Sequence, residues 1–354
     1  MTPIILEVNL KNLIHNYNEL KKINKKGKTA AVVKANAYGI GVKETTKKLM
    51  KEGCKDFFVA TTEEAIELRK FNKKINIYVL NGFLKSEINL FIKYKITFVI
   101  NNIKEFNIIK KIKKKIPIII HYDTGMNRLG LNFNEICLIS NKIKKTNLKI
   151  KYIISHLASS EKRKDKFNNI QLFLFKKIFN YFKNYKFSIA NSSGIFLNKN
   201  FHFDMTRPGI SLYGGYGNEY IKKRIKPVVK LKARVLQIRK IYKNQTIGYN
   251  QTYKVRKTQY VATIAIGYAD GMFRNLSNKG FVYFNNHKAK IIGNISMDSL
   301  VIDISKFYKN IKIGNYVELI NEKNDIEMVA RQAKTVSQNI LTSFGNRIKI
   351  KYIK

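Results

Sequence analysis

The chain has 354 residues, 45% of them hydrophobic, which suits a large α/β domain followed by a smaller second domain. The formal net charge is +45, but the lysines are dispersed and no helix-turn-helix, zinc-finger or RNA-recognition motif accompanies them, so we expect no nucleic-acid partner. Apolar runs shorter than a membrane span and a start without a signal-peptide pattern predict no membrane partner and a cytoplasmic location.

The opening run "IILEVNL" is strand-like, and from there to residue 226 apolar β-rich runs alternate with helix-period runs. Helix patterns cover residues 42–53, 61–71, 85–94 and 166–184, and Thr62 with Glu63 marks one helix start. Eight strand–helix units favour a closed parallel (β/α)8 barrel over residues 8–226, and a doubly wound open sheet is the alternative. The expected strands are residues 29–37, 56–61, 75–81, 96–100, 116–123, 149–157, 187–193 and 203–211.

After a polar boundary at Pro227, the sequence pattern changes to short strand-like runs separated by turns that contain Gly and Asn. This pattern predicts a mostly β domain over residues 227–354, with one late helix pattern at 327–344. Because the opening strand, residues 1–7, precedes the first helix, we expect it to pair with this second domain.

Polar or ionisable residues follow five of the barrel strands, in "VKANAYG", "HYDTGMNRLG", "SHLASSE", "ANSSGI" and "TRPGISLYG". The carboxyl ends of the strands are where a parallel barrel carries its chemistry, and the loops after strands seven and eight are its usual phosphate site. Lys34, at an apolar strand end, is expected to have a lowered pKa and a nucleophilic amine, although most single lysines of this kind only snorkel to the surface. A Schiff-base lysine, a phosphate cradle and a barrel together suggest pyridoxal phosphate.

These motifs carry a resemblance to the alanine racemase family, which belongs to the barrel-type (fold type III) pyridoxal-phosphate enzymes. The elements "AVVKANAYGIG", "DTGMNRLG", "SHLASS", "NSSG", "RPGISLYG", "GYADG", "ISMDSL" and "LTSFGNR" occur in the order typical of that family and span nearly the whole chain. The resemblance implies interconversion of L- and D-alanine with pyridoxal 5'-phosphate, and supply of D-alanine for peptidoglycan.

By this resemblance Lys34 would bind the cofactor covalently and act as the base on one face of the substrate α-carbon. Tyr268 of a second subunit would be the base on the other face, so the active form would be a homodimer with composite sites. His156 and Arg207 would form the network behind the ring and the tyrosine. Because an arginine stays charged and accepts no hydrogen bond, Arg207 would keep the ring nitrogen unprotonated.

The resemblance also implies residues for the two anionic groups, the cofactor phosphate and the substrate carboxylate. Arg128 and the backbone N–H of Met297, the latter again from the partner, would bind the carboxylate. The phosphate would be bound by Tyr38, Ser192 and the backbone of Gly209 and Ile210, with Asn191 nearby.

Two positions depart from the family pattern. His121 stands where many relatives have a lysine that becomes carbamylated, so we expect no carbamate and another partner for Arg128. Asn346 stands near the place of a phosphate-binding tyrosine, and Tyr352 lies too far along to replace it, so one phosphate hydroxyl is expected to be missing.

Three alternatives stay open: a racemase of broader amino-acid range, a barrel-type decarboxylase, and a basic nucleic-acid-binding protein. A decarboxylase would need an acid such as a cysteine from the β domain, whereas Cys54 and Cys137 both fall in the expected barrel and Ser296 occupies the usual cysteine position. The two cysteines are expected to be reduced packing residues, and no metal site is predicted. Charge alone supports nucleic-acid binding.

Overall fold

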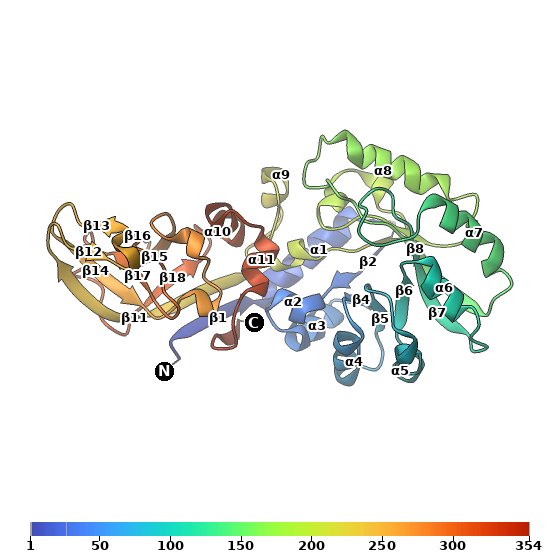
Figure 1. The fold of residues 1–354 in the computed structure, drawn as a ribbon, viewed down its shortest axis with the longest axis horizontal. Helices are drawn as coiled ribbons and strands as arrows, with labels where there is room; N and C mark the ends of the chain where they lie inside the picture. Colours follow the sequence, from blue (N-terminus) through green and yellow to red (C-terminus); the bar gives the residue numbers. More distant parts are fainter. Residues whose placement is uncertain (1, 26, 354) are drawn as a thin grey trace.

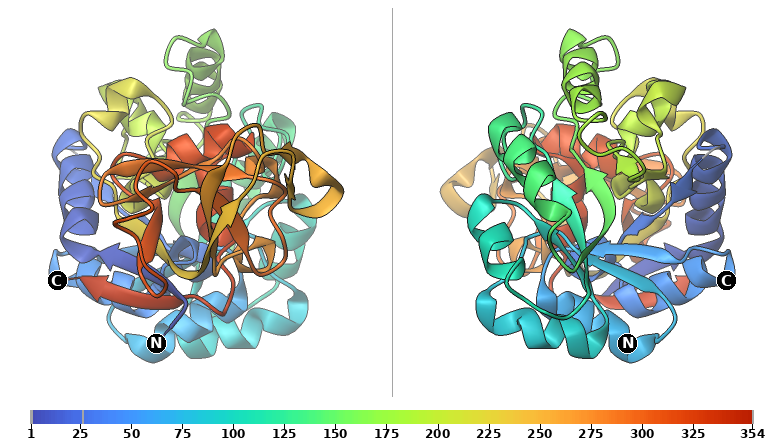
Figure 2. Two further views of the ribbon diagram at one scale, coloured as in Figure 1. Left: turned by 90° about the vertical axis from the view of Figure 1, so that its left-hand side faces the viewer. Right: turned by 90° about the vertical axis from the view of Figure 1, so that its right-hand side faces the viewer.

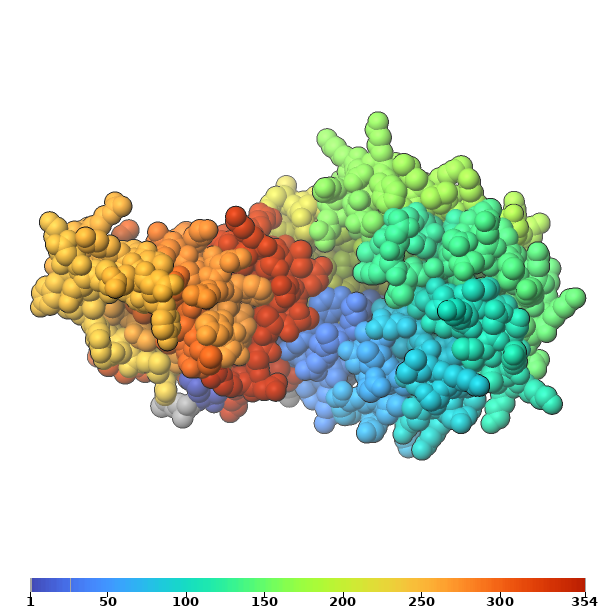
Figure 3. All heavy atoms as spheres, in the orientation of Figure 1, coloured from blue at the N-terminus to red at the C-terminus, as the bar shows by residue number. Residues whose placement is uncertain are grey.

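The computed structural model describes residues 2–25 and 27–353, which form two lobes side by side in an elongated molecule (Figures 1 and 3). The barrel lobe contains most of the first 226 residues, and the β lobe contains the rest together with the first strand. Segments near the C-terminus lie where the lobes meet (Figure 3).

The barrel lobe consists of parallel strands surrounded by helices, as the sequence predicts (Figure 2). Seven strands pair in chain order from β3 to β9. The sheet closes into a barrel at β10. Backbone carbonyl oxygens in and beside β10 accept from the N–H groups of Lys28, Ala30 and Val32 at 2.8–3.0 Å. Arg207 N donates to Ala190 O at 2.9 Å on the other side of β10. The strands are β2 (Lys28–Thr29), β3 (Ala31–Val32), β4 (Asp56–Val59), β5 (Asn76–Val79), β6 (Thr97–Ile100), β7 (Ile116–His121), β8 (Leu148–Ile154), β9 (Phe187–Ser188) and β10 (Met205–Thr206).

Helices surround the strands, and α1 lies against α3 and the short 3₁₀ turn at Ile210–Tyr213 that follows β10. Capping residues set the helix starts: the Thr61 hydroxyl accepts from Glu64 N at 3.3 Å, so α4 begins at Thr62. The helices of this lobe are α1 (Leu10–Ile23), α2 (Lys34–Tyr38), α3 (Val42–Lys51), α4 (Thr62–Phe71), α5 (Ile88–Tyr94), α6 (Ile103–Ile109), α7 (Phe133–Ile143), α8 (Lys166–Lys177) and α9 (Glu219–Lys222).

The barrel interior is filled by side chains, as in other closed barrels of this size. A larger core lies between the strands and the outer helices and continues into the β lobe. The interior cluster consists of Ala30, Val32, Phe58, Tyr78, Val99, Ile119, Tyr152, Ile154 and Met205.

Three expected strands are much shorter than their apolar runs. In the expected strand 29–37, the hydrogen-bonded strand pairing ends at Val32. In the expected strands 187–193 and 203–211, only two residues each are paired as a strand. In all three places the chain leaves the ladder early, because its next residues form the loops that line the site.

The β lobe is built from antiparallel strands that close on themselves, since β11 pairs with both β14 and β18. The strand order of this sheet is β14-β17-β16-β15-β18-β11-β1-β19, and β1 is antiparallel to β11 and parallel to β19. The strands are β1 (Ile4–Asn9), β11 (Val229–Ile241), β12 (Thr246–Ile247), β13 (Tyr253–Lys254), β14 (Gln259–Ile264), β15 (Phe281–Phe284), β16 (His287–Ile292), β17 (Leu300–Asp303), β18 (Tyr316–Ile320) and β19 (Lys349–Ile353).

The late helix pattern at 327–344 forms two helices, α10 (Ile326–Ala333) and α11 (Ser337–Thr342), rather than one. Lys334 adopts a left-handed conformation with φ of 56°, which ends α10 and turns α11 toward the barrel. Within the described residues, no helix has the length and apolar character needed to cross a membrane.

Candidate active site

A cavity of about 540 Å³ opens at the carboxyl ends of the barrel strands, beneath α11 of the β lobe. Most of the residues that the sequence predicts for the site meet there, although Tyr268 and Met297 do not. The lining consists of Val32, Lys34, Ala35, Tyr38, Leu80, Asn81, His121, Arg128, Leu129, Ile154, His156, Glu161, Asn191, Ser192, Ser193, Arg207, Gly209, Ile210, Gln338 and Thr342.

Lys34 comes directly after the first barrel strand and begins α2, which is a left-handed turn. Residues 35–38 have φ of 52° to 55°, a conformation that costs non-glycine residues roughly 1–2 kcal/mol each. The Glu64 carboxylate binds this turn, accepting from Ala35 N at 2.6 Å and from Ala60 N at 2.7 Å. Burial and the charge of Arg128 lower the pKa of the Lys34 amine, and Glu64 opposes that shift.

The left-handed turn brings Tyr38 against the loops that follow β9 and β10. A Cβ on Gly209 would lie 2.4 Å from the Tyr38 hydroxyl, so this close approach requires glycine. The Ser192 hydroxyl accepts from Gly209 N at 2.9 Å and from Ser211 N at 3.2 Å. Hydroxyls and backbone N–H groups therefore gather at this end of the cavity.

Arg207 is 5% exposed and crosses the carboxyl ends of three strands. Its Nε donates to Ser188 Oγ at 2.9 Å, and its Nη2 donates to Ser155 O. No carboxylate of the described residues pairs with it. Burial lowers the pKa of Arg207 to about 10, so the guanidinium stays charged at neutral pH.

Two histidines of the lining are neutral. Burial, and then the charges of Arg207 and Arg128, lower the pKa of His121 to about 3 and that of His156 well below its ordinary value. Asn101 donates from Nδ2 to Leu80 O at 2.9 Å, so its Oδ1 accepts from His121 Nδ1 at 2.8 Å. This contact fixes the tautomer of His121 with Nε2 as an acceptor.

Asn191 lines the cavity, but its amide binds the protein itself. Its Oδ1 accepts from Ser160 Oγ at 2.8 Å and from Gly194 N at 2.9 Å, and its Nδ2 donates to Leu157 O at 3.4 Å. Asn191 therefore joins the loops after strands β8 and β9.

Sequence reasoning missed several lining residues that long-range packing brings in. Asn81 follows β5, and Gln338 and Thr342 come from α11 of the other lobe. Glu161 also faces the cavity, where burial and the nearby Glu327 carboxylate raise its pKa. A polar residue two positions beyond the end of β5 is a signal that the strand-end argument could have used for Asn81.

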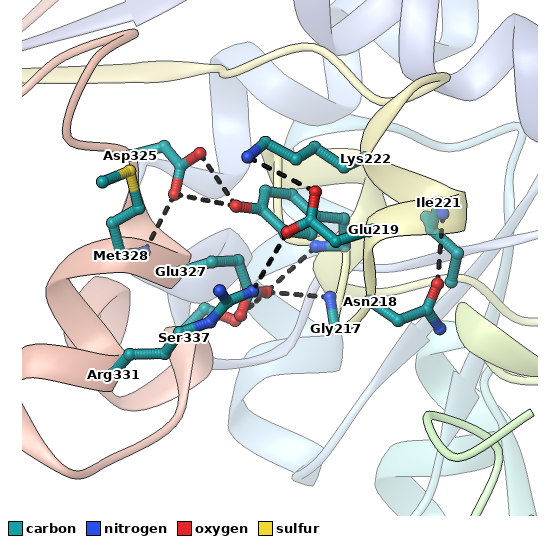
Figure 4. A network of polar contacts seen from close by, with 11 residues as sticks. Gly217, Asn218, Glu219, Ile221, Lys222, Asp325, Glu327, Met328, Arg331 and Ser337 are labelled. Atoms are coloured by element: carbon teal, nitrogen blue, oxygen red, sulfur yellow. Dashed lines mark hydrogen bonds and ion pairs between the residues drawn. The ribbon is translucent and has the colours of Figure 1, made fainter.

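Polar contacts around Glu327 hold α11 over the cavity (Figure 4). Its Oε1 accepts from Tyr216 N at 2.9 Å, Gly217 N at 3.1 Å and Ser337 Oγ at 2.9 Å. Tyr216 belongs to the barrel lobe and Ser337 begins α11, so one carboxylate joins the two lobes beside the site. The Tyr216 hydroxyl donates in turn to Asp325 Oδ2 at 3.0 Å.

Tyr268 and Met297 lie on the surface of the β lobe and do not line the cavity of their own chain. Tyr268 is 45% exposed and Met297 is 53% exposed. The loops that carry them are adjacent, since Tyr268 N donates to Ser296 O at 3.0 Å and Ala269 N donates to Met297 O at 3.0 Å.

Neither Asn346 nor Tyr352 lines the cavity. Asn346 is exposed, and the Tyr352 hydroxyl donates to Ile40 O at 3.0 Å beside the end of the left-handed turn. Among the described residues, no group of three or more histidine, cysteine or carboxylate side chains has a spacing suited to a metal ion.

Comparison with known proteins assigns the chain to a family. The family model "Alanine racemase, N-terminal domain" matches residues 8–217, and "Alanine racemase, C-terminal domain" matches residues 228–352. A protein of Rickettsia akari (strain Hartford) named alanine racemase is 39% identical over 361 aligned residues, covering both chains fully.

Solved structures agree with this assignment. The structure titled "Crystal structure of alanine racemase from Bartonella henselae with covalently bound pyridoxal phosphate" is 39% identical, with a TM-score of 0.95 over the full length of both chains. That of the biosynthetic alanine racemase from Pseudomonas aeruginosa is 27% identical, with a TM-score of 0.94 and the same full coverage. The resemblance is therefore confirmed: this chain belongs to the alanine racemase family.

Proposed function

We propose that this protein interconverts L- and D-alanine with pyridoxal 5'-phosphate, by a two-base mechanism in sites shared between two subunits. The observation that carries the proposal is the division of the predicted residues into two groups. Lys34 and its neighbours line one cavity, whereas Tyr268 and Met297 lie together on an exposed surface of the other lobe. The two groups would complete each other across a homodimer interface.

The residues of the cavity fit pyridoxal phosphate. The wall formed by Ser192, Ser193 and Gly209 offers hydroxyls for a phosphate, and the Gly209 N–H, which here donates to Ser192 Oγ, would turn to it. Tyr38 is the neighbouring phenol, and its hydroxyl has no hydrogen-bond partner among the described residues. Burial raises the pKa of Tyr38 to about 12, so it stays a donor at neutral pH. Asn191 would act indirectly, by positioning the loop that carries Ser192.

When bound, pyridoxal phosphate withdraws electrons from the substrate and makes its α-hydrogen more acidic. The chain supplies the two proton acceptors: Lys34 Nζ takes or returns the proton on one face, and the partner's Tyr268 Oη does so on the other. The lowered pKa of Lys34 increases the fraction of free amine near neutral pH.

Neutral His156 and charged Arg207 would stabilise the phenolate form of the partner's Tyr268 and keep the ring nitrogen without a proton. Arg128 would bind the substrate carboxylate together with the Met297 N–H of the partner. We propose that His121 provides Arg128 with a neutral acceptor at Nε2 in place of a carbamate, because its other nitrogen is engaged by Asn101.

We also propose a division into a barrel domain of residues 8–226 and a β domain of residues 227–354 that includes residues 1–7. The family models end and begin at residues 217 and 228, and β1 pairs with β11, which supports this division. A cytoplasmic location and the supply of D-alanine to peptidoglycan remain predictions.

The first test is conversion of L-alanine to D-alanine by the purified protein loaded with pyridoxal phosphate. We expect Lys34→Ala to abolish conversion and Tyr268→Phe to reduce it by at least 10²-fold, since one proton acceptor then lacks its titrating group. Borohydride treatment should fix the mass of the cofactor on the peptide containing Lys34. Conversion by Lys34→Ala at the wild-type rate would refute the mechanism, and preferred turnover of another amino acid would support the broader-range alternative.

A further inference from the structure

Arg347 joins the two exposed loops that carry Tyr268 and Met297. We define the Tyr268 loop as residues 267–271 and the Met297 loop as residues 294–299. Arg347 Nε donates to Asp270 Oδ1 at 2.8 Å, and Arg347 Nη1 donates to Asp298 Oδ1 at 2.7 Å. Each aspartate lies within two residues of the side chain or N–H that the proposed mechanism uses.

The Asp270 carboxylate is the buried end of this connection. Asp270 is 1% exposed, and its second oxygen, Oδ2, accepts from Gly267 N at 3.0 Å. The same carboxylate thus closes the Tyr268 loop and accepts from Arg347. The Arg347 side chain is half-exposed, and its loss would leave the buried Asp270 carboxylate without a cation, which is costly.

The remaining contacts show that the two loops form one unit. Strands β14 and β17 pair as neighbours up to Ile264 and Leu300, and the loops continue from their ends. Gly267 packs against the Met297 loop so closely that a Cβ would lie 2.2 Å from Met297 O. Arg347 spans the open side of this unit, because its guanidinium has one donor for each loop.

We propose that Arg347 is a positioning residue that fixes Tyr268 and Met297 relative to each other before they enter the partner's cavity. The inference rests on the proposed function, since it assigns the proton acceptor and the carboxylate-binding N–H to this unit. Arg347 itself does not touch the substrate. Its two ion pairs set the distance between the Tyr268 hydroxyl, which acts at the substrate α-carbon, and the Met297 N–H, which binds the substrate carboxylate.

The test compares Arg347→Met and Arg347→Lys with Arg239→Met, a change at an exposed arginine of the same lobe. Amide hydrogen exchange of the purified proteins should be faster in both loops of Arg347→Met and unchanged in Arg239→Met. Arg347→Lys, which keeps the charge but loses the two-pronged geometry, should give an intermediate effect.

Kinetic isotope effects on the loaded enzymes separate positioning from a general loss of folded protein. A misplaced Tyr268 slows proton transfer at its hydroxyl relative to transfer at Lys34. With alanine deuterated at the α-carbon, the isotope effect should rise for the enantiomer that Tyr268 deprotonates and fall for its mirror image. We expect kcat/KM to fall on the order of 10²-fold in Arg347→Met, with a raised KM.

Unchanged hydrogen exchange in the loops, or rates lowered by one common factor with both isotope effects unchanged, would overturn the proposal. Failure of the proposed function would look different. In that case the wild-type protein would not racemise alanine, while hydrogen exchange would still report on the connection between the loops.

Discussion

At the scale of single residues, burial and two neighbouring arginines keep the histidines of the cavity neutral. Burial, and after it the charges of Arg207 and Arg128, lower the pKa of both His121 and His156. Neutral imidazoles can accept hydrogen bonds from guanidinium groups, whereas protonated ones would repel them. The substrate carboxylate and the cofactor phosphate would therefore meet a positive site that does not lose its internal hydrogen bonds near neutral pH.

His121 makes this state measurable through stability. Its folded pKa is about 3, below the ordinary value of about 6.5 in an unfolded chain. The unfolded state therefore takes up a proton first, so the His121 contribution is intact above pH 6.5 and is lost as the pH falls toward 3. Linkage gives about 2 kcal/mol of lost stability between pH 7 and pH 5, as an upper value. Urea unfolding of the wild type and His121→Gln at both pH values should show a smaller loss in the variant.

The matched control is His287→Gln, a change at an exposed histidine of the β lobe. It should lose the same stability as the wild type between the two pH values. An equal pH dependence in all three proteins would contradict a neutral, buried His121.

Sequence alone could predict the residues whose chemistry is unusual for their place. Lys34 at the end of an apolar run and the polar strand ends are of this kind, and the structure brings them into one cavity. Glu64 and Arg347 could not be predicted, because glutamate and arginine are ordinary on a surface. Their roles depend on contacts with Ala35, Asp270 and Asp298, which only the folded chain creates.

At the scale of elements, the left-handed turn at residues 35–38 is the most unusual local structure near the site. The exposed Ala35 has φ of 52°, which glycine adopts without steric cost. We expect Ala35→Gly to leave stability unchanged or raise it by up to about 1 kcal/mol, since relief of strain exceeds the added flexibility of the unfolded chain. Thermal and urea unfolding of the purified protein would measure this.

An ordinary right-handed helix supplies the comparison. Lys47 is exposed in the middle of α3, and Lys47→Gly should be about 1 kcal/mol less stable than Lys47→Ala. A similar loss for Ala35→Gly would mean that the turn is not left-handed in solution.

The same turn shows why element boundaries were harder to predict than element types. The sequence pattern of residues 29–37 is that of one strand, but the strand pairing stops at Val32. The residues that follow instead form the left-handed turn, in which Ala35 N binds Glu64 and Tyr38 packs against Gly209. The division into a parallel barrel and a β lobe was predictable, since it depends on the order of many elements.

At the scale of the whole molecule, the two lobes are joined in a way that places Tyr268 away from Lys34 of the same chain. Asn16 donates to Lys226 O at 2.9 Å and accepts from Lys226 N at 2.8 Å where the chain passes between the lobes. Glu327 joins them again beside the cavity. With the lobes connected at both places, the exposed loop of Tyr268 is available to a second copy of the chain.

Complementation between two inactive variants tests this arrangement directly. Lys34→Ala and Tyr268→Phe protomers, mixed under conditions that allow subunit exchange, should form heterodimers in which one site combines the wild-type Lys34 of one protomer with the wild-type Tyr268 of the other. With random pairing of equal amounts, about a quarter of the wild-type activity should return. If both groups came from one chain, every site in the mixture would lack one of them and no activity would return. A mixture of Lys34→Ala with itself controls for exchange alone, and sedimentation of the active mixture should show a dimer.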